Sequence, residues 1–226
     1  CVLAAFLDFE GAFNAVWHDG LRKMLREEPK IPRKMAGWLS DFLEGRTFVV
    51  KVGKAVSSRR EIMAGVPQGS AISPALFSFF TRNVADCEGL LARRGEAAIY
   101  ADDVTLMAEG VDQSLAEAAL KTRLRGVEAW SARWRRPLNP AKCAVMVFGS
   151  GTRRTPNVRL NGAQVPVVKE TRYLGVDFDD RLSFKPHVNR ICEEMGVRSR
   201  FLFKLRKMGV SDESTKVWYR SMVRTL

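Results

Sequence analysis

Two adjacent aspartates, Asp102 and Asp103, divide an otherwise apolar segment of the chain into two short halves. The halves, 97–101 and 104–108, are each long enough for one strand, and the polar break between them favours a tight turn. The run 2–7 is a further buried-strand pattern, and it also ends in an acid, Asp8. A sheet that holds all three segments would gather these carboxylates at the strand ends, so the sequence predicts an acidic cluster there.

The predicted cluster has the chemistry of a divalent-cation site. Hard cations prefer carboxylate oxygens, and neighbouring carboxylates repel each other unless a cation lies between them. Polymerising nucleotides by phosphoryl transfer uses two such ions roughly 4 Å apart, one at the attacking hydroxyl and one at the leaving pyrophosphate. The alternative for Asp102 and Asp103 is a solvated acidic turn that binds nothing.

The net charge narrows the class of partner. Lys and Arg total 37 against 25 Asp and Glu, a formal charge of +12, which favours a polyanion such as nucleic acid. No apolar run approaches the roughly 20 residues that span a bilayer, and no signal-peptide pattern opens the chain. We therefore expect an intracellular protein without a membrane partner. Four cysteines lack the paired spacing of a zinc site and are predicted to be small core residues: Cys1, Cys87, Cys143 and Cys192.

Helix and strand patterns alternate along the chain and predict an α+β fold in which helices back one sheet. A helix is predicted to begin at Ser73 and Pro74. Another is predicted to begin with a capping box of Ser114 and Glu117 and to stop at Pro137. The other predicted elements are a helix over 31–43, strands over 46–52, 144–148 and 173–178, a hairpin around Asn161-Gly162, and a basic helix from about Pro186.

Large aromatic side chains recur at helical spacing in several of these segments. Such stripes normally face the interior of a domain, so core packing is predicted for each of them. The residues are Trp38, Phe77, Phe80, Trp130 and Trp134.

The segment Tyr100-Ala101-Asp102-Asp103 resembles the YxDD box of reverse transcriptases, especially the YADD form of non-LTR retrotransposons and group II introns. Four more segments resemble motifs of that family, in the family's order: 7–16 the first catalytic strand, 65–70 the glycine-rich motif, 138–143 the lysine motif and 173–176 the primer-grip hairpin. The chain thus resembles the reverse transcriptase domain of a non-LTR, LINE-like retrotransposon. We expect it to be a fragment of a longer protein.

This resemblance implies both a fold and an activity. The implied fold is a polymerase palm, an antiparallel sheet backed by helices, over residues 1–180 with motifs A to E. The start of a helical thumb follows over 181–226, and the fingers are missing. The implied activity is RNA-directed DNA polymerisation in retrotransposition, with two Mg²⁺ ions or Mn²⁺ in their place. The implied partners are an RNA template, a DNA primer and deoxynucleoside triphosphates, and the implied location is the nucleus.

The resemblance also assigns roles to single residues. Asp8, Asp102 and Asp103 match the catalytic residues and metal ligands. Phe13 matches the family's steric gate, whose aromatic face excludes a ribose 2′-hydroxyl, and Lys142 would protonate the leaving pyrophosphate or remain a solvated lysine. The predicted nucleotide-binding residues are Phe9, Phe13, Gln68, Gly69 and Lys142. The predicted primer- and template-binding residues are Gly65, Pro67, Tyr100, Leu174 and Gly175.

One departure and two competing functions accompany this interpretation. Asn14 stands where retrotransposon relatives usually have Asp. A retroelement remnant that binds nucleic acid without catalysis would keep the fold and the charge. An RNA-directed RNA polymerase is disfavoured by Phe13 and by the Tyr-Ala-Asp-Asp setting. The basic residues of 190–206 are predicted to contact a nucleic-acid backbone, with a solvated helix face as the alternative.

Overall fold

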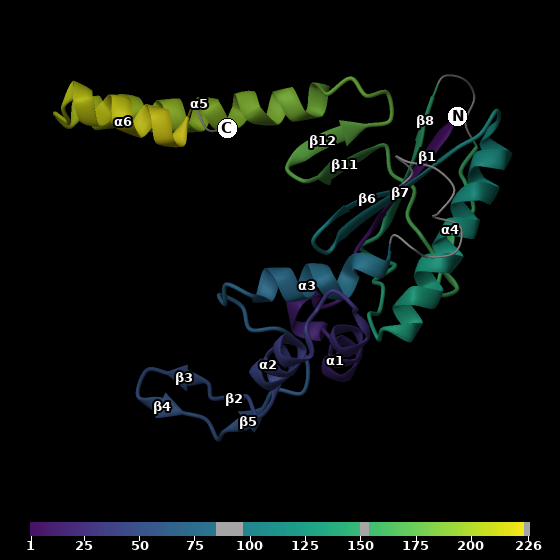
Figure 1. Ribbon diagram of the computed structural model, residues 1–226. Coiled ribbons are helices and arrows are strands. Elements are labelled where there is room, and N and C mark those ends of the chain that lie inside the picture. The colour runs from purple at the N-terminus through teal and green to yellow at the C-terminus, as the bar shows by residue number, and fades with distance from the viewer. Residues whose placement is uncertain (85–96, 150–153, 224–226) are drawn as a thin grey trace. The chain divides into compact units, whose positions relative to one another are not determined.

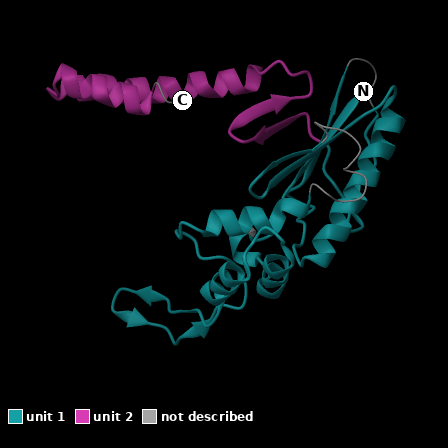
Figure 2. Cartoon of the chain, viewed as in Figure 1, with its two compact units in different colours: residues 1–167 teal, residues 168–226 magenta. Residues whose placement is uncertain are grey.

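The structure, a computed structural model, describes residues 1–84, 97–149 and 154–223. It divides into two compact units, Cys1–Val167 and Val168–Leu226, which Figure 2 shows in different colours. Each unit is described by itself below. The boundary after residue 180 between palm and thumb stays a prediction.

The first unit is organised around a four-stranded antiparallel sheet in the order β6-β7-β1-β8 (Figure 1). Its strands are β1 (Val2–Leu7), β6 (Ala97–Tyr100), β7 (Asp103–Glu109) and β8 (Ala144–Phe148). The central strand β1 is almost wholly buried, as its continuous apolar run predicts. The predicted strands 2–7 and 144–148 and the hairpin around Asp102 are therefore confirmed, and so is the α+β class.

One face of the sheet is covered by α4 (Gln113–Arg133), which packs against β7 and β1. Its buried stripe includes Leu120, Leu124 and Val127. The predicted capping box is wrong: the N-cap is Asp112, whose side chain accepts a hydrogen bond from the N–H of Leu115 at 2.9 Å. An N-cap must precede the first helical residue, and Ser114 already lies within the first turn.

Three further helices complete the body of the first unit: α1 (His18–Glu27), α2 (Arg33–Leu43) and α3 (Ser73–Thr81). Helix α1 packs against both α2 and α3, and the 3₁₀ turns Ala12–Ala15 and Arg82–Val84 flank the group. Helix α3 begins where predicted, with Pro74 in its first turn, but Ile72 occupies the cap position. The predicted capping role of Ser73 is therefore wrong.

Short two-stranded ribbons extend the first unit. The predicted strand 46–52 is wrong, because the chain breaks after two residues and forms β2 (Thr47–Phe48) and β3 (Lys51–Val52). It then reverses, and β4 (Ala55–Val56) and β5 (Arg60–Glu61) pair with β3 and β2. The predicted hairpin at Asn161-Gly162 is confirmed, with β9 (Arg159–Leu160) and β10 (Ala163–Gln164). Both turn residues have positive φ, 49° and 79°, as a type I′ turn requires.

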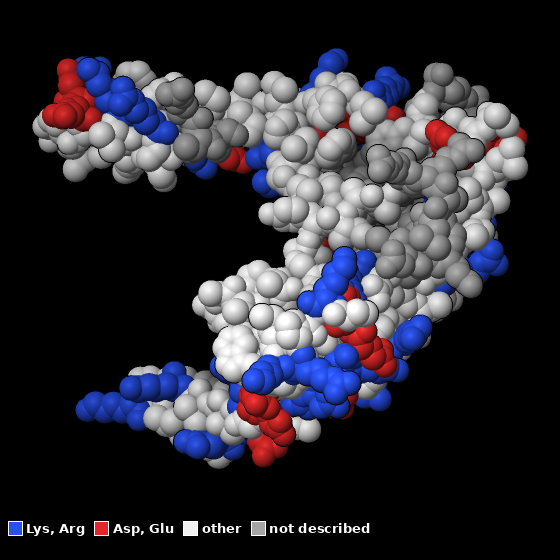
Figure 3. All heavy atoms as spheres, in the orientation of Figure 1, with Lys and Arg blue, Asp and Glu red and all other residues white. Residues whose placement is uncertain are grey.

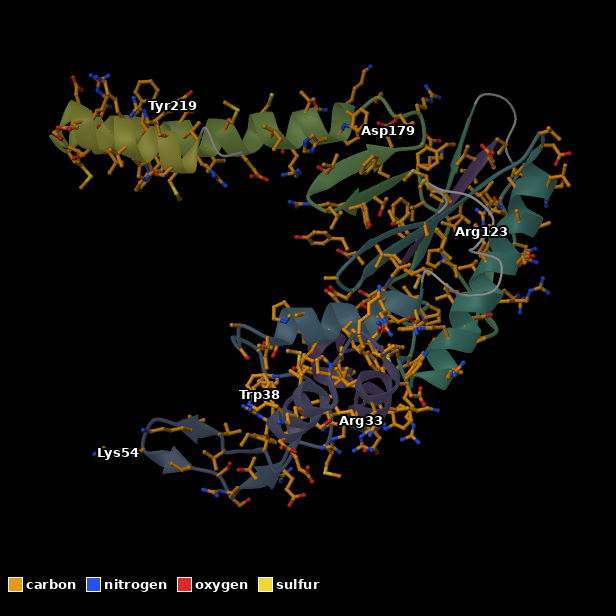
Figure 4. The ribbon with its side chains drawn as sticks, in the orientation of Figure 1. Arg33, Trp38, Lys54, Arg123, Asp179 and Tyr219 are labelled. Carbon is orange, nitrogen blue, oxygen red and sulfur yellow. The ribbon has the colours of Figure 1, made fainter. Side chains whose placement is uncertain are left out.

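The core predictions succeed for most aromatic residues. Phe77, Phe80, Trp130 and Trp134 are buried, but Trp38 is 60% exposed on α2 (Figure 4). Helical spacing reports which residues share a face, whereas burial needs another element to cover that face. Among the cysteines, Cys143 is buried, Cys1 and Cys192 are exposed against expectation, and Cys87 lies outside the described residues. Within the described ranges, no helix is long and apolar enough to cross a membrane.

The second unit combines a β-hairpin with two helices. The hairpin strands are β11 (Glu170–Tyr173) and β12 (Val176–Asp179), and the helices are α5 (Lys185–Lys207) and α6 (Asp212–Met222). The predicted single strand 173–178 is wrong, because Leu174 and Gly175 adopt positive φ and reverse the chain. Helix α5, predicted from about Pro186, is confirmed and packs against β12 and α6.

An ion pair holds the first turns of α5 against the β11–β12 hairpin. Nε of Arg190 donates to the Asp177 carboxylate at 2.5 Å, and its Nη1 donates to Glu194 at 2.9 Å. The Asp179 carboxylate accepts hydrogen bonds from the backbone N–H groups of Ser183 and Phe184, which hold its pKa below the usual value (Figure 4). Arg190 is thus engaged within its own unit, and the nucleic-acid contact predicted for this helix stays a prediction.

Candidate functional site

Strand register brings the three predicted carboxylates to one end of the sheet. Leu7 at the end of β1 pairs with Val104, so Asp8 follows beside Asp103. Tyr100 pairs with Asp103 across a two-residue turn, in which Ala101 has a φ of 54° and Asp102 forms the tip. The predicted acidic cluster therefore arises from two adjacent antiparallel strands.

The three carboxylates lie close enough to influence one another's charge. Burial raises the pKa of Asp103, and the negative charges of Asp102 and then Asp8 raise it further. A divalent cation would reverse this effect, because it favours the ionised form of every carboxylate around it. The donor set therefore fits a hard cation. Within the described ranges, however, no three His, Cys, Asp or Glu side chains are already gathered into a metal cluster, so the carboxylates would have to turn toward an ion.

A pocket of about 390 Å³ opens beside the carboxylates. It collects most of the predicted catalytic and nucleotide-binding side chains: Asp8, Asp102, Phe9, Phe13, Gln68 and Lys142. Asp103 and Gly69 do not line it. Glu10, Asn14 and Asn139 also line the pocket, and none of the three was predicted to belong to the site. All three lie inside the matched motifs, and Asn14 also stands where retrotransposon relatives usually have Asp.

The glycine-rich segment is bound edge to edge to the segment that follows Asp8. The N–H of Gly65 donates to the carbonyl of Val16, and the N–H of Val66 donates to that of Phe13, both at 2.8 Å. The buried His18 ring lies with Nε2 2.7 Å from the Gly65 carbonyl oxygen. These bonds place Phe13 and Gln68, which are far apart in sequence, on the wall of one pocket.

Gly65 is required by this contact between segments. Its φ is +93°, and a Cβ built there would lie 2.8 Å from the Asn14 carbonyl oxygen and 2.9 Å from the Asn14 Cα. Only a residue without a side chain allows two backbones to approach so closely. The structure thus explains Gly65 through packing within the protein, and its predicted primer or template contact stays a prediction.

The aromatic residues of the pocket have different surroundings. Phe13 is half-buried and stacks on Phe77, with ring centroids 4.4 Å apart and planes at 21°. Phe9 is buried and meets Trp130 edge to face at 5.6 Å. Tyr100 is 65% exposed beside the carboxylates. Phe13 therefore presents part of one ring to the pocket and has firm support behind it.

The lysine motif is attached to the end of β1. The N–H of Asn139 donates to the Asp8 carbonyl at 3.0 Å, and the Asn139 carbonyl accepts from the N–H groups of Lys142 and Cys143. The Cys143 thiol accepts a hydrogen bond from the N–H of Asp8, and burial raises its pKa. A neutral thiol is a poor metal ligand, so Cys143 supports the site without joining it.

The remaining predicted residues are distributed more widely. Pro67 is half-buried in the glycine-rich segment, and Gly69 has a φ of +84° on the surface. Leu174 and Gly175 form the turn of the hairpin in the second unit. Pro67 and Gly69 thus do not line the pocket, and the primer or template contacts predicted for Leu174 and Gly175 stay predictions.

Known proteins resemble this chain in sequence and in fold. Residues 1–178 match the sequence profile of the family described as reverse transcriptase (RNA-dependent DNA polymerase). The chain is 33% identical over 198 residues to the RNA-directed DNA polymerase from mobile element jockey of Drosophila funebris, covering 86% of this chain and 21% of that protein. It is 35% identical over 191 residues to the probable RNA-directed DNA polymerase from transposon BS of Drosophila melanogaster, covering 82% and 21%.

The chain therefore spans about a fifth of the length of the curated relatives it matches. Among solved structures, apo telomerase from Candida tropicalis matches with a TM-score of 0.53 and 11% identity, over 81% of this chain and 32% of that one. At that identity the likeness concerns the fold alone.

Proposed function

The chain belongs to the reverse transcriptase (RNA-dependent DNA polymerase) family, with relatives in non-LTR retrotransposons, and on that premise we propose that it carries the polymerase site of a longer retrotransposon protein. The proposed reaction extends a DNA primer on an RNA template by two-metal nucleotidyl transfer. The observation that supports it most is the register of β1 and β7, which gathers Asp8, Asp102 and Asp103 beside a pocket.

The carboxylates would hold the catalytic ions. Asp8 and Asp102 line the pocket and are the proposed principal ligands, and Asp103 completes the acidic cluster. Bound there, two Mg²⁺ ions, or Mn²⁺ in their place, would activate the primer hydroxyl and neutralise the charge of the leaving pyrophosphate. The chain itself positions the acids, because Asp8 directly follows β1, Asp103 begins β7, and Asp102 lies in the tight turn that joins the paired strands β6 and β7.

The pocket wall would select and orient the nucleotide. Phe13 projects into the pocket and is supported by the stacked Phe77 ring, so it resists displacement by a bulkier sugar. A 2′-hydroxyl would collide with it, and deoxynucleotides would be preferred. Gln68 lines the same wall, with its amide donating to Asn14 at 3.3 Å, and would contact the nucleotide together with Phe9. A contact from the backbone of Gly69, which follows Gln68 but does not line the pocket, also belongs to this proposal.

Lys142 is the proposed proton donor to pyrophosphate. It lines the pocket, and its backbone is held to Asn139, which is in turn bonded to Asp8. The ammonium group sits on a flexible stem, so it can follow a leaving group over a short distance. Its pairing to the end of β1 keeps that stem beside the carboxylates.

Nucleic acid is the proposed macromolecular partner. The formal charge of +12 favours a polyanion, and Figure 3 shows Lys and Arg side chains gathered over α1, α2 and the ribbon β2–β5. The predicted primer and template contacts of Gly65, Pro67, Tyr100, Leu174 and Gly175 belong to this proposal. So does an intracellular, nuclear location.

The test is primer extension by the full-length protein that contains the chain, with Mg²⁺, a primed RNA template and deoxynucleotides. We expect extension by the wild type and its loss in Asp102→Asn, which keeps the shape but removes the charge that binds cations. Asp19→Asn, an exposed acid on α1, is the matched control and should extend normally. Full extension by Asp102→Asn would refute the metal assignment, and salt-sensitive nucleic-acid binding without any extension by the wild type would favour the remnant.

A further inference from the structure

A buried arginine lies beneath the candidate site. Arg136, just beyond the end of α4, is only 1% exposed. Arginine is almost never fully buried without a structural or functional reason, because removing a guanidinium from water is costly. Burial lowers the pKa of Arg136, and the negative charge of Asp102 acts in the opposite direction. The cation is therefore close enough to sense the acidic cluster.

The first contact of Arg136 holds the segment that follows Asp8. Its Nη1 donates to the carbonyl of Glu10 at 3.3 Å, and the N–H of Glu10 donates to the carbonyl of the neighbouring Pro137 at 2.9 Å. A second bond fixes Arg136 itself, whose N–H donates to the Ser131 carbonyl at 2.9 Å. These bonds hold the chain just beyond α4 against Glu10, which lines the pocket.

The second contact is aromatic. The guanidinium carbon lies 5.7 Å from the ring centroid of Phe9 and 5.7 Å from that of Phe77. Both distances are within the range of cation–π attraction, which strengthens when the pair is shielded from water. One planar cation therefore links the ring that follows Asp8 to the ring on α3.

Phe77 connects Arg136 to the wall of the pocket. It stacks on Phe13 at 4.4 Å with nearly parallel planes, and Phe13 lines the pocket. A ring supported on one face has little freedom to tilt in a close-packed interior. The position of Phe13 thus depends on Phe77, and the position of Phe77 depends on Arg136.

We propose that Arg136 is a positioning residue for sugar selection, which acts by holding Phe77 and thereby the Phe13 ring against the nucleotide pocket. This inference rests on the proposed function, because it concerns the choice between deoxynucleotides and ribonucleotides at that site. Arg136 does not touch the nucleotide. A merely structural arginine would affect both substrates equally, whereas a positioning residue would change their ratio.

The experiment measures kcat/KM for a deoxynucleotide and for the matching ribonucleotide in the full-length protein. Arg136→Met keeps the apolar stem and removes the planar cation, and we expect the ratio of the two efficiencies to fall about 10-fold or more, since small misplacements of positioning groups cost up to about 100-fold. Arg136→Lys keeps the positive charge but loses the planar guanidinium, so an intermediate ratio is expected. The matched control is Arg135→Met, an exposed neighbour that lies over Trp17 instead, and its ratio should match the wild type.

A second variant keeps the test decisive if Arg136→Met does not fold. Phe77→Leu retains an apolar side chain on α3 and removes the stacked ring, so it too should lower the sugar ratio. Equal losses for both nucleotides in the folded variants would overturn the inference and leave the proposed function intact. A wild-type protein that extends no primer would overturn the proposed function and this inference together.

Discussion

Replacing Gly65 with alanine tests the contact between the glycine-rich segment and the segment after Asp8. Two penalties add at this position. The φ of +93° is unfavourable for a residue with a side chain, at about 1–2 kcal/mol. The new Cβ would also lie within 3.0 Å of three backbone atoms of Asn14, and forcing packed atoms apart costs about 1–3 kcal/mol.

We therefore expect Gly65→Ala to lower the free energy of unfolding by about 2–5 kcal/mol, a large share of the total for an ordinary domain. Gly69→Ala is the matched control, because its φ is +84° but no described atom lies within 4 Å of its Cβ position. It should cost only about 1–2 kcal/mol. Urea unfolding followed by the fluorescence of the buried tryptophans measures both. Equal losses in the two variants would show that the close approach to Asn14 is not a tight contact.

Three smaller predictions use the same unfolding measurement. Phe80→Ala removes a fully buried ring packed edge to face on an indole and should cost about 3–5 kcal/mol; a loss below about 1 kcal/mol would mean that the interior collapses around the cavity. Asp112→Ala should cost about 1 kcal/mol because α4 loses its cap, and Ser114→Ala should cost less. A larger cost for Ser114→Ala than for Asp112→Ala would instead support the capping box of Ser114 and Glu117. The hydrogen bond from Arg190 lowers the pKa of Asp177 below its ordinary value of 3.8. The ionised Asp177 therefore stabilises the folded state above pH 3.8, and this stabilisation is lost as the pH falls through the lowered pKa. Asp177→Asn should flatten the acid limb of the stability curve, and an unchanged slope would contradict the assignment.

Local patterns in the sequence were sufficient for the elements that carry the acids. The strand 2–7 and the hairpin around Asp102 were predictable because a buried strand needs an unbroken apolar run and a turn needs a polar break. The turn at Asn161-Gly162 was predictable for a similar reason, since few residue pairs tolerate positive φ at both positions. Motif order then indicated the family, which the comparisons confirmed.

Local patterns failed where two neighbouring residues compete for one role, and where a distant segment decides what is buried. A capping box at Ser114 and an interior position for Trp38 were both reasonable from spacing, yet the cap is Asp112 and α2 leaves Trp38 exposed. Periodicity shows which residues share a face and carries no information about what covers that face.

Local sequence patterns were therefore enough to predict where the three carboxylates lie, at two strand ends and a turn. Their surroundings were set by tertiary structure. Gly65 meets Asn14 and Arg136 reaches Glu10 across long stretches of chain. Such contacts depend on shape and burial, because segments far apart in the sequence meet only in the folded chain. Only there does the absence of a Cβ at Gly65 permit a close backbone approach, and only there is the Arg136 guanidinium removed from water. The sequence determined which chemistry the site can carry, and only the fold decided what holds its parts in place.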